Sequence, residues 1–350
     1  MDGSHRPHRA REGERPELIP LEEIRRARER IGDDVLRTPL VPIGGMLEAS
    51  PAKPATPGGR PRPPAASAGD RIWLKLECLQ PVGSFKLRGA LSAVRAASSD
   101  ELAAGVVTAS AGNMAQGVAW AAREAGVPAR AIVPADAPRA KLDRVEALGG
   151  EVMPVPHEEW WQALVDRGRD GVDGFFVHPV ADEAVMAGNG TIGLELAEDA
   201  PEFDTVVIPW GGGGLTTGIA SALDALRPEV RVVTAEPETG APLAAAFAAG
   251  EPREIEFQPS WVDGAGGPAL LPGMWERARE LVDDAVAVPL AEVAEAVRLL
   301  ASRAHVVAEG AGALALAAAL ARDDRCICIV SGGNIDPDVY AGIISPAATA

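Results

Sequence analysis

The sequence has little cysteine. Its 350 residues include only Cys78, Cys326 and Cys328. An odd number of cysteines without a C-x-x-C spacing suggests neither a disulfide framework nor a zinc site. Cys326 and Cys328 alternate within the apolar run CICIVS, which is typical of thiols packed in a buried strand. The five histidines show no metal-binding spacing either.

Long apolar runs and excess positive charge are also missing. The longest uncharged apolar stretch, around residues 310–321, falls short of the roughly 18 residues that a membrane span needs. The formal net charge is −17, whereas nucleic acids and anionic membranes bind basic surfaces. The polar N-terminal stretch MDGSHRPHRAREGERPEL contains no secretory hydrophobic region. We therefore expect a cytoplasmic protein with no nucleic-acid and no membrane partner.

What the chain does contain is a regular alternation of strand-like and helix-like segments. Helical patterns separate the apolar runs RIWLKLE, GVVTAS, ARAIVP, EVMPV, FFVHP, TVVIPW, VRVVTAE, AVAVP and CICIVS. Continuous apolar strands favour burial on both faces and hence parallel sheets. The sequence therefore predicts an α/β fold.

Two segments fall outside this alternation. Residues 1–18 are polar and contain proline, so they are predicted to be disordered. Residues 50–70 are rich in Pro, Ala and Gly, and are predicted to form a flexible surface loop. Between them, PLEEIRRARERI predicts a helix with Leu21, Ile24 and Ile31 on one face.

Glycine-marked turns suggest a ligand site. SAGNMAQG at 110–117, WGGGGLTTG at 210–218 and SGGNID at 331–336 each follow a predicted strand and open a helix. In open α/β sheets ligands bind at the carboxyl ends of strands, so these turns are expected to face one ligand.

The run of four glycines at 211–214 is the clearest candidate for an anion site. Glycines let the backbone approach a phosphate, and a helix N-terminus adds N–H donors. The run fits neither the dinucleotide pattern G-x-G-x-x-G nor the P-loop. It indicates a phosphorylated ligand that is neither a dinucleotide nor ATP, although a plain tight turn is the alternative.

Lys86 lies between Phe85 and Leu87 in the stretch VGSFKLRGA. Lysine is rarely buried without a partner. A lysine in a desolvated pocket has a depressed pKa and can form a Schiff base. The residues alone leave a second interpretation open, in which the stem packs and the amine reaches water.

Several motifs together resemble one family. LKLE..QPVGSFKLRGA, SAGN.AQG, AGNGTIGLE, GGGGL, EGAGA and SGGN occur in the order found in the fold-type II pyridoxal 5′-phosphate (PLP) enzymes. Within these, the chain is similar to the serine/threonine dehydratases (ammonia-lyases) and serine racemases. The resemblance implies two open, mostly parallel twisted-sheet domains, as in the tryptophan synthase β-like fold. The larger would comprise 19–105 and 179–342, the smaller 106–178, with the cofactor in the cleft between them.

The resemblance also assigns roles. Lys86 would hold the cofactor as a Schiff base and act as general base, Phe85 would pack beside the cofactor, and Asn113 would hydrogen-bond its 3′-oxygen. The implied phosphate and ring-nitrogen contacts are Gly211, Gly212, Gly213, Gly214, Leu215 and Ser331. The implied substrate-binding turn is Ser110, Ala111, Gly112 and Met114.

Four positions refine this expectation. A serine hydroxyl such as Ser331 cannot stabilise a pyridinium as an aspartate would, which favours β-elimination over transamination. Ala111 stands where racemases carry a serine as a second acid/base, which favours a lyase. Met114 replaces the usual histidine, so the resemblance does not identify the group carried on the substrate's β-carbon. Glu236 matches a family cation ligand, but Pro242 stands in place of its partner aspartate.

The expected activity is elimination of water from an L-β-hydroxy amino acid, threonine or serine by default, giving a 2-oxo acid and ammonia. The alternatives are an amino-acid racemase, a dehydratase for a bulkier or modified β-hydroxy amino acid, and a non-catalytic PLP-binding protein. The resemblance further implies a homodimer acting on a small amino-acid substrate.

Overall fold

The computed structural model describes residues 18–43 and 71–345. The predicted loop 50–70 and nearly all of the predicted disordered segment 1–18 lie outside these residues. The strands are β1 (Leu40–Pro42), β2 (Ile72–Lys75), β3 (Val106–Ala109), β4 (Ala129–Pro134), β5 (Gly150–Val155), β6 (Phe175–Phe176), β7 (Thr205–Pro209), β8 (Arg231–Pro237), β9 (Asp284–Val288) and β10 (Cys326–Ile329).

The helices fill the intervals between the strands, as the alternating pattern predicts. They are α1 (Leu21–Ile31), α3 (Lys86–Ala96), α4 (Asn113–Ala125), α5 (Arg139–Ala147), α6 (His157–Asp166), α7 (Glu183–Asp199), α8 (Gly214–Leu226), α9 (Pro242–Ala249), α10 (Met274–Leu281), α11 (Leu290–Leu299), α12 (Gly310–Leu320) and α13 (Pro337–Ile344). In α1 the side chains of Ile24, Ala27 and Ile31 are buried, which confirms the predicted apolar face.

The strands form two separate sheets. The larger has six strands in the order β1-β2-β10-β7-β8-β9, and the smaller has four in the order β5-β4-β3-β6. Every neighbouring pair is parallel except β1 with β2. The predicted α/β class with two mostly parallel sheets is confirmed. The strands of the smaller sheet lie within residues 106–178, and the boundaries of the smaller domain stay a prediction.

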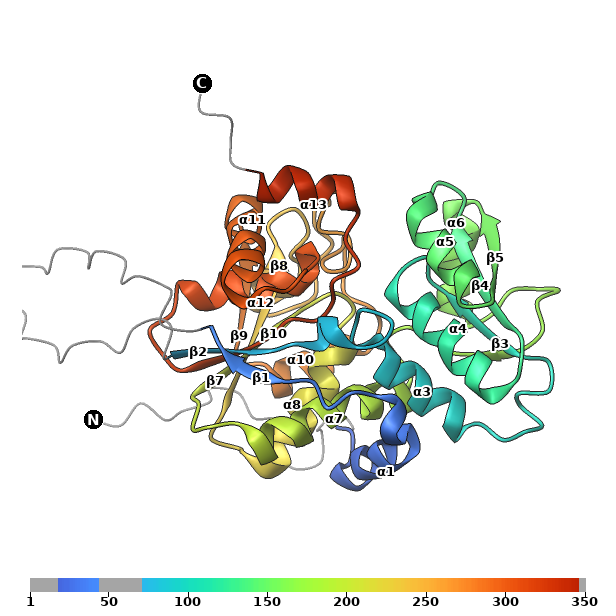
Figure 1. Ribbon diagram of the computed structural model, residues 1–350, viewed down its shortest axis with the longest axis horizontal. Coiled ribbons are helices and arrows are strands. Elements are labelled where there is room, and N and C mark those ends of the chain that lie inside the picture. Colours follow the sequence, from blue (N-terminus) through green and yellow to red (C-terminus); the bar gives the residue numbers. More distant parts are fainter. Residues whose placement is uncertain (1–17, 44–70, 346–350) are drawn as a thin grey trace, which may run out of the picture.

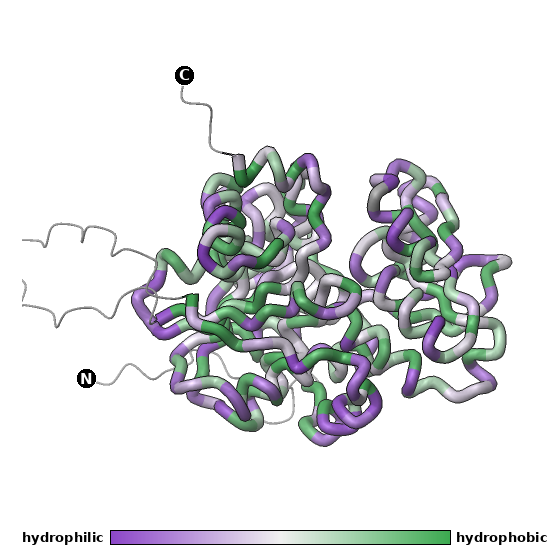
Figure 2. The backbone as a smooth tube through the Cα atoms, in the orientation of Figure 1, coloured by the Kyte–Doolittle hydropathy of each residue, from purple (hydrophilic) through white to green (hydrophobic). Residues whose placement is uncertain are grey.

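The larger sheet is buried on both faces, which explains its continuous apolar strands. Val206 and Ile208 of β7 pack into one cluster with Ile219 of α8, whereas Val207 packs into a second cluster with Leu314 of α12. Figure 2 shows hydrophobic colours along the interior strands and hydrophilic colours along the outer helix α1.

The helix carrying Lys86 lies where the two sheets meet. In Figure 1, β3–β5 and α4–α6 form the body on the right, and α3 lies between it and the larger body. α3 packs against α4 on one side and α7 on the other. Among residues 18–43 and 71–345, no helix is both long and apolar enough to cross a membrane.

Candidate active site

Lys86 is the first residue of α3. The backbone just before it is hydrogen-bonded to the loop that follows β10. The Phe85 N–H donates to the Ser331 carbonyl at 3.0 Å, and Ser84 forms an isolated bridge with Gly332. The predicted lysine and the predicted ring-nitrogen contact are therefore brought together, although they lie far apart in the sequence.

The amine of Lys86 is held by a neutral group. Its Nζ donates to the Pro179 carbonyl at 2.7 Å and lies 5.2 Å from the centroid of the Phe85 ring. Within the described part of the chain, no carboxylate forms an ion pair with this amine. Burial lowers the pKa of Lys86 to about 8, and only the charge of Glu309 opposes that shift. A larger share of the amine is therefore neutral, and hence nucleophilic, than for an ordinary lysine.

The segment 178–182 connects this amine to the glycine loop. Pro179 accepts the bond from Lys86, and the adjacent Val180 fills the space beside the glycines. A Cβ atom on Gly212 would lie 2.5 Å from Val180 Cγ2, and one on Gly214 would lie 2.6 Å from the Val180 carbonyl oxygen. These contacts require glycine at both positions, because no side chain fits so close to the neighbouring chain.

His178 holds this segment in place. Its Nδ1 accepts hydrogen bonds from the N–H groups of Val180 and Ala181, at 3.0 and 2.8 Å. The His178 N–H in turn donates to Asp182 at 2.7 Å, and Asp182 pairs with Arg167. Burial lowers the pKa of His178 to about 4, so the ring stays neutral and Nδ1 remains an acceptor at neutral pH.

The glycine loop presents unused backbone donors. Among the described residues, the N–H groups of Gly211, Gly212 and Gly213 donate to no protein acceptor. α8 begins at Gly214, and the first N–H groups of a helix have no partner within it. Gly213 has φ +93°, which favours glycine. Leu215, in the first turn of α8, is buried. The loop can therefore bind an anion such as a phosphate.

Asn113 and Glu309 lie together beside the same loops. Asn113 is the first residue of α4, and Glu309 immediately precedes α12. Asn113 Nδ2 donates to Glu309 Oε1 at 2.8 Å. Burial raises the pKa of Glu309 to about 7, and the bond from Asn113 acts against that rise. Gly332 has no side chain, and any Cβ there would collide with Glu309 Oε1.

The predicted substrate turn precedes α4. Ser110 Oγ accepts a hydrogen bond from the Gly112 N–H at 3.3 Å. Ala111 packs against the apolar cluster between α3 and α4. Met114 is 1% exposed and belongs to the same cluster, so its thioether is part of the core. What this residue can offer a substrate is its backbone N–H, in the first turn of the helix.

Glu236 is buried at the end of β8. Its carboxylate accepts hydrogen bonds from the N–H groups of Leu243 and Ala244, at 3.1 and 2.8 Å. Burial raises the pKa of Glu236 to about 7. In the ranges 18–43 and 71–345, no group of three or more His, Cys, Asp or Glu side chains is arranged to hold a metal ion. A cation at Glu236 stays a prediction, as do the roles assigned to the other site residues.

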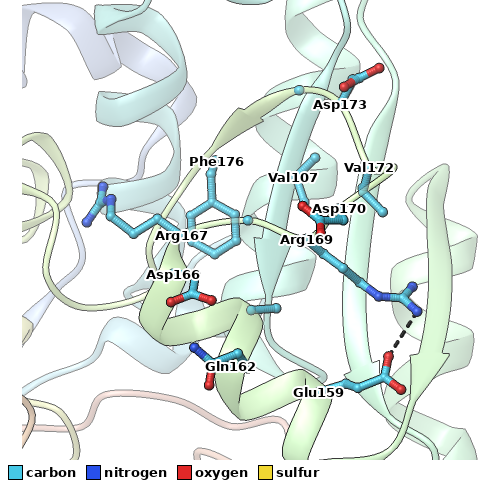
Figure 3. Close-up of a pocket in the computed structure, with 13 residues that line it drawn as sticks. Val107, Glu159, Gln162, Asp166, Arg167, Arg169, Asp170, Val172, Asp173 and Phe176 are labelled. Atoms are coloured by element: carbon cyan, nitrogen blue, oxygen red, sulfur yellow. Dashed lines mark hydrogen bonds and ion pairs between the residues drawn. The ribbon is translucent and has the colours of Figure 1, made fainter.

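A cavity of about 700 Å³ lies elsewhere, on the smaller sheet (Figure 3). It is formed by α6, β3, β6 and the loop between α6 and β6, and the ion pair of Arg169 with Glu159 lies beside it at 3.0 Å. None of the residues predicted to bind cofactor or substrate lines this cavity.

Two groups at the site were missed from the sequence. The Pro179 carbonyl that binds Lys86 leaves no signal, because every residue has such a group. Asn334 donates to Asn113 Oδ1 at 2.7 Å. It lies in the motif SGGN, from which the sequence analysis assigned a role only to Ser331.

The sequence matches the family described as pyridoxal-phosphate dependent enzyme over residues 52–332. The L-threonine ammonia-lyase of Thermotoga maritima is 37% identical over 94% of this chain and 79% of its own length. A serine racemase of Oryza sativa subsp. indica is 35% identical over 77% of this chain and 83% of its own length.

Solved structures agree with these sequence matches. Maize serine racemase superposes with a TM-score of 0.81 at 31% identity, over 93% of this chain and 97% of that one. A threonine deaminase from T.th. gives a TM-score of 0.74 at 34% identity, over 90% and 98% of the two chains. The chain is thus a member of the pyridoxal-phosphate dependent enzyme family, with the fold of its fold-type II members.

Proposed function

We propose that this protein is a PLP-dependent ammonia-lyase that eliminates water from an L-β-hydroxy amino acid, with threonine or serine as the default substrate. The observation that carries the proposal is the Lys86 amine, which has a pKa of about 8 and is 2.7 Å from the neutral Pro179 carbonyl. The names of the relatives, threonine ammonia-lyase among them, support the same activity.

The residues present fit the cofactor. The unused N–H groups of Gly211, Gly212 and Gly213 suit its phosphate, and the Lys86 amine suits its aldehyde. Asn113 Nδ2 has a second hydrogen beyond the one given to Glu309, and it suits the 3′-oxygen. When bound, PLP supplies an electron sink that makes the substrate's Cα–H acidic.

Lys86 can then move the proton. With a pKa of about 8, roughly a tenth of the amine is neutral at pH 7, far more than for an ordinary lysine. A neutral amine with a tuned pKa is an efficient general base for the Cα proton. The Pro179 carbonyl fixes the position of Nζ without adding a charge that would hold the proton there.

The turn before α4 can orient the substrate. The N–H groups at the start of α4 point out of its N-terminus, where the helix dipole favours a carboxylate. Ser110 is half-buried beside them, and its hydroxyl hydrogen can be given to the same carboxylate. A substrate held there would keep its Cα hydrogen in a fixed direction.

Ala111 is the basis for proposing a lyase rather than a racemase. It has no titratable group, and it stands where the related racemases carry a serine that serves as a second acid/base. A site with one base removes the Cα proton but cannot return it to the opposite face. Serine racemases are also among the relatives, so the two activities must be separated by experiment.

The test is an assay of the purified protein with L-threonine and L-serine. We expect 2-oxo acid and ammonia in equal amounts, and no D-serine in the unreacted serine. Lys86→Ala should lose turnover by on the order of 10³-fold or more, whereas Arg28→Gln, at an exposed ion pair with Glu198, should keep it. Retained turnover in Lys86→Ala, or D-serine formed faster than 2-oxo acid, would contradict the proposal.

The proposed assembly is a homodimer, as the family resemblance implies. A molecular mass near twice the 36.2 kDa of one chain, measured by light scattering, would support it.

A further inference from the structure

Polar side chains form a continuous chain from α5 to the carboxylate before α12. Arg144 Nη1 donates to Asn334 Oδ1 at 3.0 Å, and Asn334 Nδ2 donates to Asn113 Oδ1 at 2.7 Å. Asn113 Nδ2 then donates to Glu309 Oε1 at 2.8 Å. The chain crosses from a helix of the smaller sheet to the start of a helix on the larger one.

The chemistry of these side chains determines which group donates and which accepts in each hydrogen bond of the series. A guanidinium has only donors, so Arg144 requires Asn334 to present its carbonyl oxygen. The Val82 carbonyl has only acceptors, and it receives the Asn334 NH2 group at 2.8 Å. Both neighbours therefore select the same orientation of the Asn334 amide. That orientation in turn requires Asn113 to present its oxygen to Asn334 and its NH2 group to Glu309.

The same groups set the charge around Glu309. The charged side chains that act on it are Asp263, which raises its pKa, and Lys141 and Arg144, which lower it. Lys86 also interacts with it electrostatically. Lys141 and Asp263 form an ion pair, so their effects on Glu309 oppose each other, whereas Arg144 bonds to a neutral amide. Arg144 therefore orients the Asn334 amide and also contributes positive charge near Glu309.

We propose that Arg144 and Asn334 are positioning residues that hold the amide of Asn113 with its NH2 group toward Glu309 and the cofactor site. The inference rests on the proposed function, because Asn113 touches the cofactor only if Lys86 binds PLP. It goes beyond the resemblance, which gives Asn113 a role but says nothing of what orients it.

The experiment compares Asn334→Asp, Arg144→Met and Arg144→Lys as PLP-loaded proteins. An aspartate at 334 keeps an acceptor for Arg144 but cannot donate to Asn113, so the Asn113 amide turns over. Methionine at 144 removes both donor and charge, whereas lysine keeps both. Arg139→Met is the matched control on α5, because Arg139 is exposed and pairs with Asp143 and Glu146 on its own helix, at 2.6 and 2.5 Å.

The readouts are kcat, KM and the pH dependence of the cofactor absorbance band. We expect kcat to fall roughly 10- to 100-fold in Asn334→Asp, the effect of one lost hydrogen bond near a charged group, with a smaller fall in Arg144→Met. The absorbance titration should shift in both, because Glu309 loses a donor or a nearby positive charge. Arg144→Lys and Arg139→Met should match the original protein.

The inference is overturned if Asn334→Asp and Arg144→Met bind PLP and keep both the original kcat and the original titration. It is also overturned if they lose thermal stability with no shift in the titration, since that outcome indicates a merely structural role. Arg144 is half-buried, so Arg144→Met keeps the test decisive if Asn334→Asp does not fold. The original protein is measured in parallel: if it neither binds PLP nor turns over substrate, the proposed function itself fails.

Discussion

Two cations lie two residues apart on α3, the half-buried Lys86 and the buried Arg88, and their surroundings are opposite. Arg88 is fully buried, and its Nε and Nη2 donate to the two oxygens of Glu77 at 2.8 Å each. Its Nη1 donates to Glu195 at 2.6 Å, and Glu195 also binds Lys75 at 2.5 Å. Arg88, Glu77, Glu195 and Lys75 form a buried ionic cluster in which two positive and two negative charges balance.

The pKa values record the difference. Burial alone would raise the pKa of Glu77, but the charge and hydrogen bonds of Arg88 outweigh it and hold that pKa below its usual value. At Lys86 burial prevails, and the pKa falls to about 8. Each charged side chain of the buried ionic cluster has a partner of opposite charge. The Lys86 amine has a neutral acceptor instead, and it can lose its proton. The cluster therefore anchors the helix that carries the reactive amine.

The largest expected effect comes from breaking the cluster. Arg88→Met leaves two buried carboxylates with one lysine, and uncompensated buried charge costs about 3–5 kcal/mol. The free energy of unfolding, measured with guanidinium chloride on the full chain, should fall by that amount. A fall below about 1 kcal/mol, the range of exposed pairs, would show that the cluster is not what holds α3.

Acid should weaken the cluster. Because the pKa of Glu77 is held below its usual value of 4.5, the folded protein binds fewer protons there than the unfolded chain. This contribution is present above pH 4.5 and is lost as the pH falls through the lower, folded pKa. Glu77→Gln should cost about 1–3 kcal/mol at pH 7, and the difference from the original protein should shrink below about pH 4. A constant difference from pH 7 to pH 3 would contradict this.

At Lys86 stability should also rise with pH, but in the alkaline range, because deprotonation there removes the cost of a buried charge. Its folded pKa is depressed from 10.5 to about 8, so the unfolded chain binds more protons between these values. The PLP-free protein should gain stability as the pH rises from 8 to 10.5. Lys86→Met should therefore be more stable than the original at pH 7, by about 1–3 kcal/mol after allowance for partial solvent access. An advantage that does not shrink between pH 8 and pH 10.5 would contradict the depressed pKa.

The smallest effect is expected at a surface pair. Arg28 and Glu198 are 2.6 Å apart, and each side chain is 43% exposed. Arg28→Gln should change the free energy of unfolding by less than about 1 kcal/mol, because solvent screens the pair and Glu198 keeps Arg37 as a partner. Unfolding in guanidinium chloride measures it, and a loss comparable to that of Arg88→Met would remove the contrast between buried and exposed pairs.

Much of the fold follows from the sequence, because buried parallel strands leave continuous apolar runs. The run ARAIVP matches β4 residue for residue. β1 was missed, since Leu40–Pro42 is short, antiparallel and at the edge of the sheet. The buried ionic cluster was missed as well. Its signal was present in charged Lys75 and Glu77 within an apolar strand segment, but pairing with Glu195 depends on packing that no local pattern encodes.

The residues proposed for the site could be picked out from the sequence only where they lie in motifs. Lys86, the glycine loop and Ser331 lie in motifs, and the sheet brings the strand ends together. Met114 faces the core because its position in the first turn of α4 directs the side chain toward α3. The Pro179 carbonyl and the contact between Arg144 and Asn334 depend on how distant backbone segments meet.

The most direct test of the central claim is reduction of the PLP-loaded protein with borohydride, followed by trypsin digestion and mass spectrometry. The other lysines, Lys53, Lys75 and Lys141, serve as internal controls. We predict a pyridoxyl group on Lys86 alone, in a peptide spanning Leu76–Arg88, because trypsin does not cleave after the modified lysine. No label on that peptide, or an equal label on Lys75 or Lys141, would contradict the claim that the Lys86 amine is the reactive one.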